Sequence, residues 1–230
     1  MVPKEWVDKM SNGRSMAELK SLMGITDKKG IENMSNEQWD MMYDNGQISL
    51  EKYSPFSEQI KTPPYRYEWI LKKVNDLKGN SLDVGCNNGA LAYLLNQKGF
   101  VAHGMDVGDQ LLEQCEKNVP EGKFVKGHAD ELIPFSDDFF HVVTALEVLE
   151  HVKDPAKMIE EMYRVLAPKG KLLITVPVNK AYDNPRHLRY FSFYSLGELF
   201  ESITDEFKIC RIYKSNDKEE RQLFALEVTK

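Results

Sequence analysis

The stretch SLDVGCNNGALAYLL, Ser81 to Leu95, decides the fold of this chain. An apolar strand pattern around Asp83 runs into a tight turn, Gly85 to Gly89, and a helical pattern begins at Ala90. Glycine lacks a Cβ atom, so its backbone can take a positive φ and a ligand can approach it closely. A buried strand that passes through such a turn into a helix presents N–H groups to a ligand. The stretch predicts a nucleotide-like cofactor site, although a purely structural turn has the same form.

The glycine spacing distinguishes between two kinds of cofactor. A dinucleotide fingerprint reads G-x-G-x-x-G, whereas this turn reads G-C-N-N-G and follows an aspartate inside the strand. An NAD-dependent oxidoreductase is therefore disfavoured. D-x-G-C-x-x-G instead resembles motif I of class I S-adenosylmethionine (AdoMet) methyltransferases. The resemblance implies that the cofactor-binding residues here are Asp83, Gly85, Cys86, Asn87 and Gly89.

Asn87 stands where many relatives in this family have glycine. Its amide side chain either points away from the cofactor or hydrogen-bonds to it, and the sequence leaves both arrangements open.

Asp106 is the second chemical landmark. It ends a predicted strand that starts at Phe100, about 20 residues after the glycine turn, where an acidic side chain can bind ribose hydroxyls. A carboxylate suits this role because it accepts both O–H donors in charge-assisted hydrogen bonds. The alternative is a helix cap, but Asp109 precedes the predicted helix 110–118 and is expected to cap it. We expect Asp106 and its neighbour Val107 to contact the cofactor.

Strand and helix patterns alternate from Tyr65 to about Val178, which predicts a doubly wound parallel sheet. The tail, FKICRIYKS and RQLFALEVTK around a polar turn, predicts an antiparallel hairpin. The predicted elements are a helix ending near Gly79, strands 81–84, 100–106, 123–126, 141–146 and 171–178, and helices 90–98, 110–118, 155–167 and 195–203.

The resemblance to class I methyltransferases extends from Tyr65 to Lys230. The run EVLEHVKDPAKMIEEMYRVLAPKGKLLITVP, Glu147 to Pro177, is similar to the family that includes ubiquinone-pathway O-methyltransferases. The resemblance implies an α/β fold: a Rossmann-like sheet of seven strands with an antiparallel last strand. It makes residues 63–230 an AdoMet-dependent methyltransferase domain.

The segment GHADELIPF, Gly127 to Phe135, resembles the family's G-D-A-x-x-L-P-F segment. The resemblance implies adenine contact at His128, Ala129 and Asp130, and a further cofactor contact at Leu146. The match has two departures, because His128 takes the acidic place and Ile133 is an extra residue. His128 can equally be an ordinary surface histidine.

The residues after the fourth strand carry the candidate chemistry. Glu147, Glu150 and His151 stand at i, i+3 and i+4, so one helical turn is expected to bring them together. They form either a site for Mg²⁺ or Mn²⁺, with His187 as a fourth ligand, or a catalytic His151 oriented by Glu150. The set is similar to that of small-RNA 3′-terminal ribose methyltransferases, in which a metal holds vicinal hydroxyls. The alternative is that the Glu–His pair only caps or packs the loop.

Two further regions bear on the acceptor. Residues 1–62 are expected to form a helical cap that either packs on the domain or closes over the site as a lid. In the second case Trp39, Met42, Tyr43 and Tyr53 would line the acceptor pocket. The cations Lys180, Arg186 and Arg189 either meet an anionic acceptor or belong to a solvated loop.

Bulk properties set limits on the function. The formal charge of −6, with no block of like charge, disfavours nonspecific nucleic-acid binding. The three cysteines, odd in number and widely separated, indicate reduced thiols. No signal peptide or membrane span is evident, so a cytoplasmic protein is expected, with no particular oligomeric state implied.

The leading hypothesis is an AdoMet-dependent methyltransferase that acts on a hydroxyl oxygen of a small metabolite or sugar. The first alternative is a metal-assisted ribose 2′-O-methyltransferase for RNA. The second is a noncatalytic AdoMet-binding or scaffold subunit.

Overall fold

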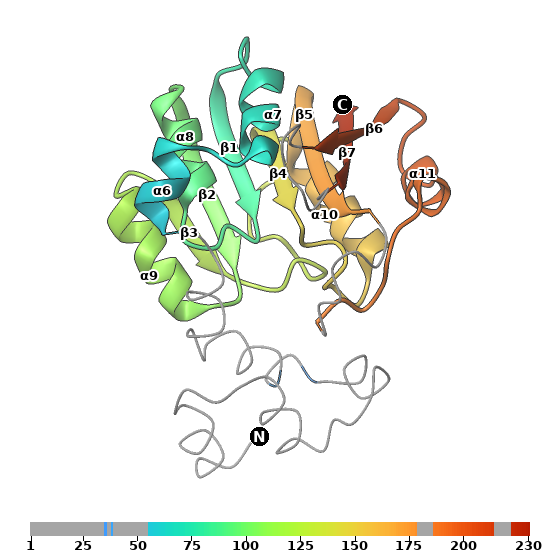
Figure 1. Cartoon of the computed structure of the whole chain (residues 1–230), viewed down its shortest axis with the longest axis horizontal. Helices are drawn as coiled ribbons and strands as arrows, with labels where there is room; N and C mark the ends of the chain where they lie inside the picture. The colour runs from blue at the N-terminus through green and yellow to red at the C-terminus, as the bar shows by residue number, and fades with distance from the viewer. Residues whose placement is uncertain (1–34, 36–37, 39–54, 179–185, 214–221) are drawn as a thin grey trace.

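The predicted seven-stranded sheet is confirmed in a computed structural model that describes residues 35, 38, 55–178, 186–213 and 222–230. The strand order is β3-β2-β1-β4-β5-β7-β6 (Figure 1). The strands are β1 Gly79–Val84, β2 Phe100–Asp106, β3 Lys123–Lys126, β4 Phe140–Leu146, β5 Leu166–Pro177, β6 Phe207–Tyr213 and β7 Gln222–Thr229. The helices are α6 Phe56–Lys61, α7 Tyr65–Lys73, α8 Ala90–Gln97, α9 Asp109–Asn118, α10 Pro155–Val165 and α11 Phe193–Glu201.

Strand β1 lies at the point where the order of the sheet reverses. It pairs in parallel with β2 on one side and with β4 on the other. The helices that follow β1 and β4 therefore leave in opposite directions, which opens a crevice beyond the carboxyl ends of these strands. The topology places a ligand site at this edge of the sheet.

Helices cover the two faces of the sheet (Figure 1). An apolar layer on each face holds them in place. One face packs on α7 and α8 through Ile70 and Leu91, and β4 and β5 contribute Val142 and Leu173 to it. The other face packs on α10 and α11. Its buried residues include Val143, Ile174, Met158, Met162 and Phe200. Neighbouring residues on a strand thus enter opposite layers, as expected for a sheet covered on both sides.

The predicted carboxyl-terminal hairpin is confirmed. Strand β7 runs antiparallel between β5 and β6. Glu227 of β7 binds Lys73 of α7 at 2.6 Å and Lys171 of β5 at 2.8 Å. The inserted strand is thereby tied to the helix that leads into β1.

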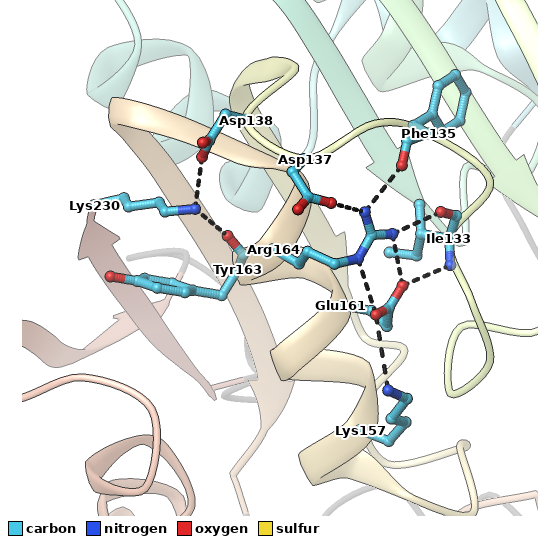
Figure 2. A network of polar contacts seen from close by, with 9 residues as sticks. All are labelled: Ile133, Phe135, Asp137, Asp138, Lys157, Glu161, Tyr163, Arg164 and Lys230. Atoms are coloured by element: carbon cyan, nitrogen blue, oxygen red, sulfur yellow. Dashed lines mark hydrogen bonds and ion pairs between the residues drawn. The ribbon is translucent and has the colours of Figure 1, made fainter.

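A polar network ties the connection between β3 and β4 to α10 (Figure 2). Arg164 donates to both oxygens of Glu161, to Asp137, and to the carbonyl oxygens of Ile133 and Phe135. Glu161 also accepts from the Ile133 amide at 2.9 Å. The Arg164 guanidinium holds the pKa of Glu161 below its ordinary value. Because this buried carboxylate is fully paired, the connection is fixed beside the cavity described below.

Several predicted element ends and one predicted cap are wrong, and α11 spans Phe193–Glu201 where 195–203 was predicted. Helix α7 stops at Lys73 and does not reach Gly79. Helix α10 stops at Val165 because Leu166 already begins β5, where it pairs with Phe140. Asp109 was predicted to cap α9 but is the first residue of this helix. The N-cap position is Gly108, and no side chain caps the helix.

The predicted amino-terminal cap lies mostly outside the described residues, as do Trp39, Met42, Tyr43 and Tyr53. The described part is α6, whose Phe56 ring packs edge-on against Tyr93 of α8 at 5.5 Å. Across the described residues, no helix combines the length and apolarity needed to span a bilayer.

Candidate active site

One cavity lies at the carboxyl edge of the sheet, where the topology predicts a ligand. Every predicted cofactor-binding residue except Gly89 lines this cavity, as do Glu147 and His151. Its lining consists of Gln59, Arg66, Tyr67, Asp83, Val84, Gly85, Cys86, Asn87, Met105, Asp106, Val107, Leu111, Gly127, His128, Ala129, Asp130, Leu146, Glu147, Val148, His151, Val152, Lys153 and Arg186.

The turn after β1 is built from left-handed residues. Gly85, Asn87 and Gly89 have φ values of 73°, 50° and 78°. Asn87 tolerates this conformation because its Oδ1 accepts a hydrogen bond from the Asn88 amide at 2.7 Å. The side-chain oxygen thus bonds back to the turn itself. A Cβ atom on Gly89 would lie 3.2 Å from the Cys115 backbone, so Gly89 permits close packing against α9.

The carboxylate of Asp106 joins β2 to this turn. Its Oδ2 accepts from the Asn87 amide at 2.9 Å, and its Oδ1 accepts from the amides of Val107 and Gly108 at 2.8 and 3.1 Å. The carboxylate is buried and borders the cavity. These bonds fix its position, and a carboxylate has more acceptor sites than these three donors use.

Asp83 is a buried acid beneath the cavity. Its Oδ1 accepts from the Thr144 hydroxyl at 2.6 Å. The pKa of Asp83 is raised to about 7, chiefly by burial and also by the nearby Asp106 carboxylate, while the Thr144 hydrogen bond and Arg66 oppose the shift. Asp83 therefore changes charge near neutral pH.

The raised pKa predicts a pH-dependent stability. The contribution of Asp83 is complete below its unfolded pKa and is lost as the pH rises through its folded pKa of about 7. Between about pH 4 and about pH 8, the wild type should lose about 4 kcal/mol of unfolding free energy relative to Asp83→Asn, at about 1.4 kcal/mol per pKa unit. Urea unfolding across this range measures the difference. Asp109→Asn, which neutralises an exposed carboxylate, is the control and should follow the wild type. If the unfolding free energy of Asp83→Asn changes with pH in the same way as that of the wild type, the expectation is wrong.

The segment after β3 forms another wall of the cavity. His128, Ala129 and Asp130 all line it. The Asp130 Oδ2 accepts from the backbone amides of Lys153 and Asp154 at 2.8 and 3.1 Å. Asp130 therefore fixes this wall to the start of α10.

A cluster of Glu150, His151 and His187 lies beside the cavity, and His151 reaches into the lining. Glu150 Oε1 lies 4.0 Å from His151 Nε2 and 3.9 Å from His187 Nε2. These distances are too long for hydrogen bonds, yet they allow all three side chains to share one cation. Both Glu150 oxygens are buried and have no hydrogen-bond partner within the described part of the chain, which is costly unless an ion or proton compensates.

Burial also sets the protonation of this cluster. It raises the pKa of Glu150 well above its ordinary value, and the charge of Glu147 adds to the effect. Burial lowers the pKa of His151 to about 3, with smaller contributions from His187 and Arg186. His151 Nδ1 lies 3.1 Å from the Arg186 carbonyl oxygen, which can only accept. The neutral imidazole therefore carries its proton on Nδ1 and leaves the Nε2 lone pair open.

The predicted grouping of Glu147 with Glu150 and His151 is wrong. Residues 147–151 form a turn and not a helix, and Glu147 has a φ of 59°. Its carboxylate is therefore directed elsewhere and pairs with Arg66 Nε at 3.2 Å. The distant His187, by contrast, does join Glu150 and His151.

The chain near His187 is fastened to the turn after β4. The Leu188 amide donates to the Glu150 carbonyl at 2.9 Å. Arg189 donates to the carbonyl oxygens of Leu149, Val152 and Lys153. Arg189 is thus a structural residue and not part of a solvated loop, whereas Lys180 lies outside the described residues.

Sequence reasoning missed the contribution of α6 and α7. Gln59, Arg66 and Tyr67 line the cavity, and the Tyr67 hydroxyl donates to Gln59 at 3.0 Å. A usable signal was present, because a helix that leads into the start of β1 must itself begin near the carboxyl edge of the sheet. Polar residues just after Pro64 were therefore candidates for this site.

Comparison with known proteins finds a similar family and similar relatives. Residues 82–174 match the sequence model of a family described as "Methyltransferase domain". A ubiquinone biosynthesis O-methyltransferase from Pseudomonas entomophila is 32% identical over 130 residues, which cover 54% of this chain and 56% of that protein. A protein of the same name from Pseudomonas fluorescens is 31% identical over 129 residues. The chain thus spans little more than half the length of the curated relatives it matches.

Two solved structures share the fold. A possible histamine N-methyltransferase from Thermotoga maritima has a TM-score of 0.58 at 20% identity, covering 76% of this chain and 94% of that one. A phosphoethanolamine N-methyltransferase from Haemonchus contortus, in complex with AdoMet, has a TM-score of 0.59 at 15% identity, covering 78% of this chain and 61% of that one.

Proposed function

We propose that this chain, which belongs to the class I AdoMet-dependent methyltransferases, transfers a methyl group to a hydroxyl oxygen of a small molecule. One observation carries the proposal. The glycine turn, the Asp106 carboxylate and the His151 imidazole all border one cavity at the switch point of the sheet. This arrangement supports the proposal, because a cofactor bound at the glycine turn would lie next to a candidate proton acceptor.

The two ends of the proposed cofactor site differ in charge. Asp106 offers a carboxylate to ribose hydroxyls, and the wall around Ala129 would contact the adenine ring. Arg66 and Asp83 lie in the same cavity and would bind the carboxylate and ammonium of the methionine moiety. Cys86, Val107 and Leu146 also line the cavity, while Gly89 would act indirectly by letting the turn pack on α9.

AdoMet, when bound, supplies a methyl group on a positively charged sulfur. The chain must then orient the acceptor oxygen and accommodate its proton. The neutral His151 Nε2 can accept a hydrogen bond from that hydroxyl. A base with a pKa of about 3 is a weak proton acceptor, so His151 needs an additional group that favours loss of the proton.

We propose that a divalent cation is this additional group, held by Glu150, His151 and His187. The Glu150 oxygens, which are buried and have no hydrogen-bond partner among the described residues, fit such an ion together with the two imidazoles, whereas Glu147 does not because it pairs with Arg66. The mixed nitrogen and oxygen donors suit Mn²⁺ better than Mg²⁺. A bound cation would lower the pKa of a hydroxyl that it contacts.

Chelation tests the metal. We expect EDTA treatment followed by desalting to lower methyl transfer at least about tenfold, with recovery on adding Mn²⁺, because the acceptor hydroxyl would lose the charge that favours its ionisation. Calorimetric AdoMet affinity should stay unchanged and serves as the control. Full activity in a chelated sample that contains no metal by elemental analysis would rule out the cation and leave His151 as an unassisted base.

The function itself is tested by calorimetry with AdoMet, followed by a screen for transfer of its labelled methyl group. Catechols, sugars and a short RNA with a free 3′ ribose form the acceptor panel. Transfer to a catechol or sugar is the expected result. Transfer only to RNA would favour the ribose methyltransferase, and AdoMet binding without transfer would favour a noncatalytic subunit.

A further inference from the structure

Arg186 places a positive charge in the wall of the cavity beside His151. The residue lines the cavity although it is only 4% exposed, and its charge is close enough to lower the pKa of His151. Its own carbonyl oxygen lies 3.1 Å from His151 Nδ1, so the backbone that carries the guanidinium is fixed relative to the imidazole. A substrate hydroxyl at His151 would therefore have a buried cation nearby.

The backbone that follows Arg186 is held by several hydrogen bonds. The following residues are bonded to the turn after β4, through the Leu188 amide and the Arg189 guanidinium. The Arg189 guanidinium binds backbone carbonyl oxygens and therefore has a structural role. Arg186 is the member of this pair that lines the cavity.

The other cations in the lining are placed for different roles. Arg66 forms an ion pair with Glu147, and Lys153 is exposed. A buried guanidinium offers a fork of N–H donors that matches the two oxygens of a carboxylate or phosphate. Near His151, this donor set favours an oxyanion over a neutral group.

We propose that the acceptor carries an oxyanion group, a carboxylate or a phosphate, in addition to its hydroxyl, and that Arg186 binds this group and so selects the acceptor. The inference rests on the proposed function, because it assigns the acceptor end of the same cavity. It predicts that small hydroxylated acids or phosphate esters are preferred over their neutral counterparts.

Matched probes test the proposal on the full chain saturated with S-adenosylhomocysteine. Calorimetry would compare 3,4-dihydroxybenzoate with 3,4-dihydroxybenzamide, and 4-hydroxyphenyl phosphate with hydroquinone. We expect the anionic member of at least one pair to bind about tenfold or more tightly, as one charge-assisted contact provides. The pair that shows the preference identifies the carboxylate or the phosphate as the source.

Substitutions then assign the preference to a residue. Arg186→Gln should abolish it, Arg186→Lys should retain part of it, and Lys208→Gln should leave it intact. Lys208 is exposed on β6, outside the cavity, so this control removes the same charge elsewhere. A folded Arg186→Gln protein that keeps the preference, or a wild type that binds both members equally or neither, would overturn the proposal.

Titrating S-adenosylhomocysteine before the acceptor probes distinguishes failure of the proposed function from failure of the inference about Arg186. If S-adenosylhomocysteine does not bind, the proposed function fails and this inference fails with it. If it binds but no anionic probe is preferred, only the inference about Arg186 is wrong.

Discussion

Asp106→Ala is expected to lower AdoMet affinity by about 100-fold, as the loss of two hydrogen bonds to a charged acceptor implies. The carboxylate has a second effect, because it holds the Asn87, Val107 and Gly108 amides in place. Its removal should therefore loosen the glycine turn as well as expose the ribose side. Calorimetric titration with AdoMet measures the loss.

Asp109→Ala is the matched control for this substitution. It removes a carboxylate three residues away that is exposed and pairs with Lys126. Its affinity for AdoMet should equal that of the wild type. Circular dichroism confirms that both variants are folded, and a folded Asp106→Ala protein with unchanged affinity would refute the cofactor assignment.

His151→Ala is expected to lower turnover by about 100-fold or more while changing AdoMet affinity little, because general acid–base groups contribute on that scale. The imidazole lies in the cavity wall beyond the turn that carries the proposed cofactor contacts. Its removal should affect the reacting hydroxyl and not the binding of AdoMet. Steady-state methyl transfer and calorimetry measure the two quantities separately.

The control for His151 is His141→Ala, which removes an exposed imidazole from the opposite end of β4. This variant should keep wild-type turnover. Loss of turnover and AdoMet affinity together in His151→Ala would indicate that the residue supports the cavity as a whole and has no specific role at the acceptor.

The turn after β1 and the end of β2 could be predicted from sequence because their chemistry is local. A strand, a glycine turn and a helix follow one another in the chain, and strand pairing then brings Asp106 to the Asn87 amide. The alternation of strand and helix patterns predicted a parallel sheet. The polar segment between the last two strand patterns predicted the antiparallel hairpin. Periodicity and turn residues are sufficient for features of this kind.

The cluster proposed to hold a metal could be predicted only in part, because its membership depends on one backbone angle. Helical spacing would group Glu147 with Glu150, but the positive φ of Glu147 breaks that turn and sends its carboxylate to Arg66. The partner lies on α7, far away in sequence. No periodic pattern in the sequence predicts such a long-range ion pair. The raised pKa of Asp83 could not be predicted either, because it depends on burial in the folded chain.

The most direct test of the central claim is calorimetric titration of the full chain with AdoMet and with S-adenosylhomocysteine. We expect saturable one-to-one binding of both, with a lower heat signal and weaker affinity in Asp106→Ala. Absence of binding by a folded wild-type chain would contradict the claim that the cavity beside the glycine turn is an AdoMet site.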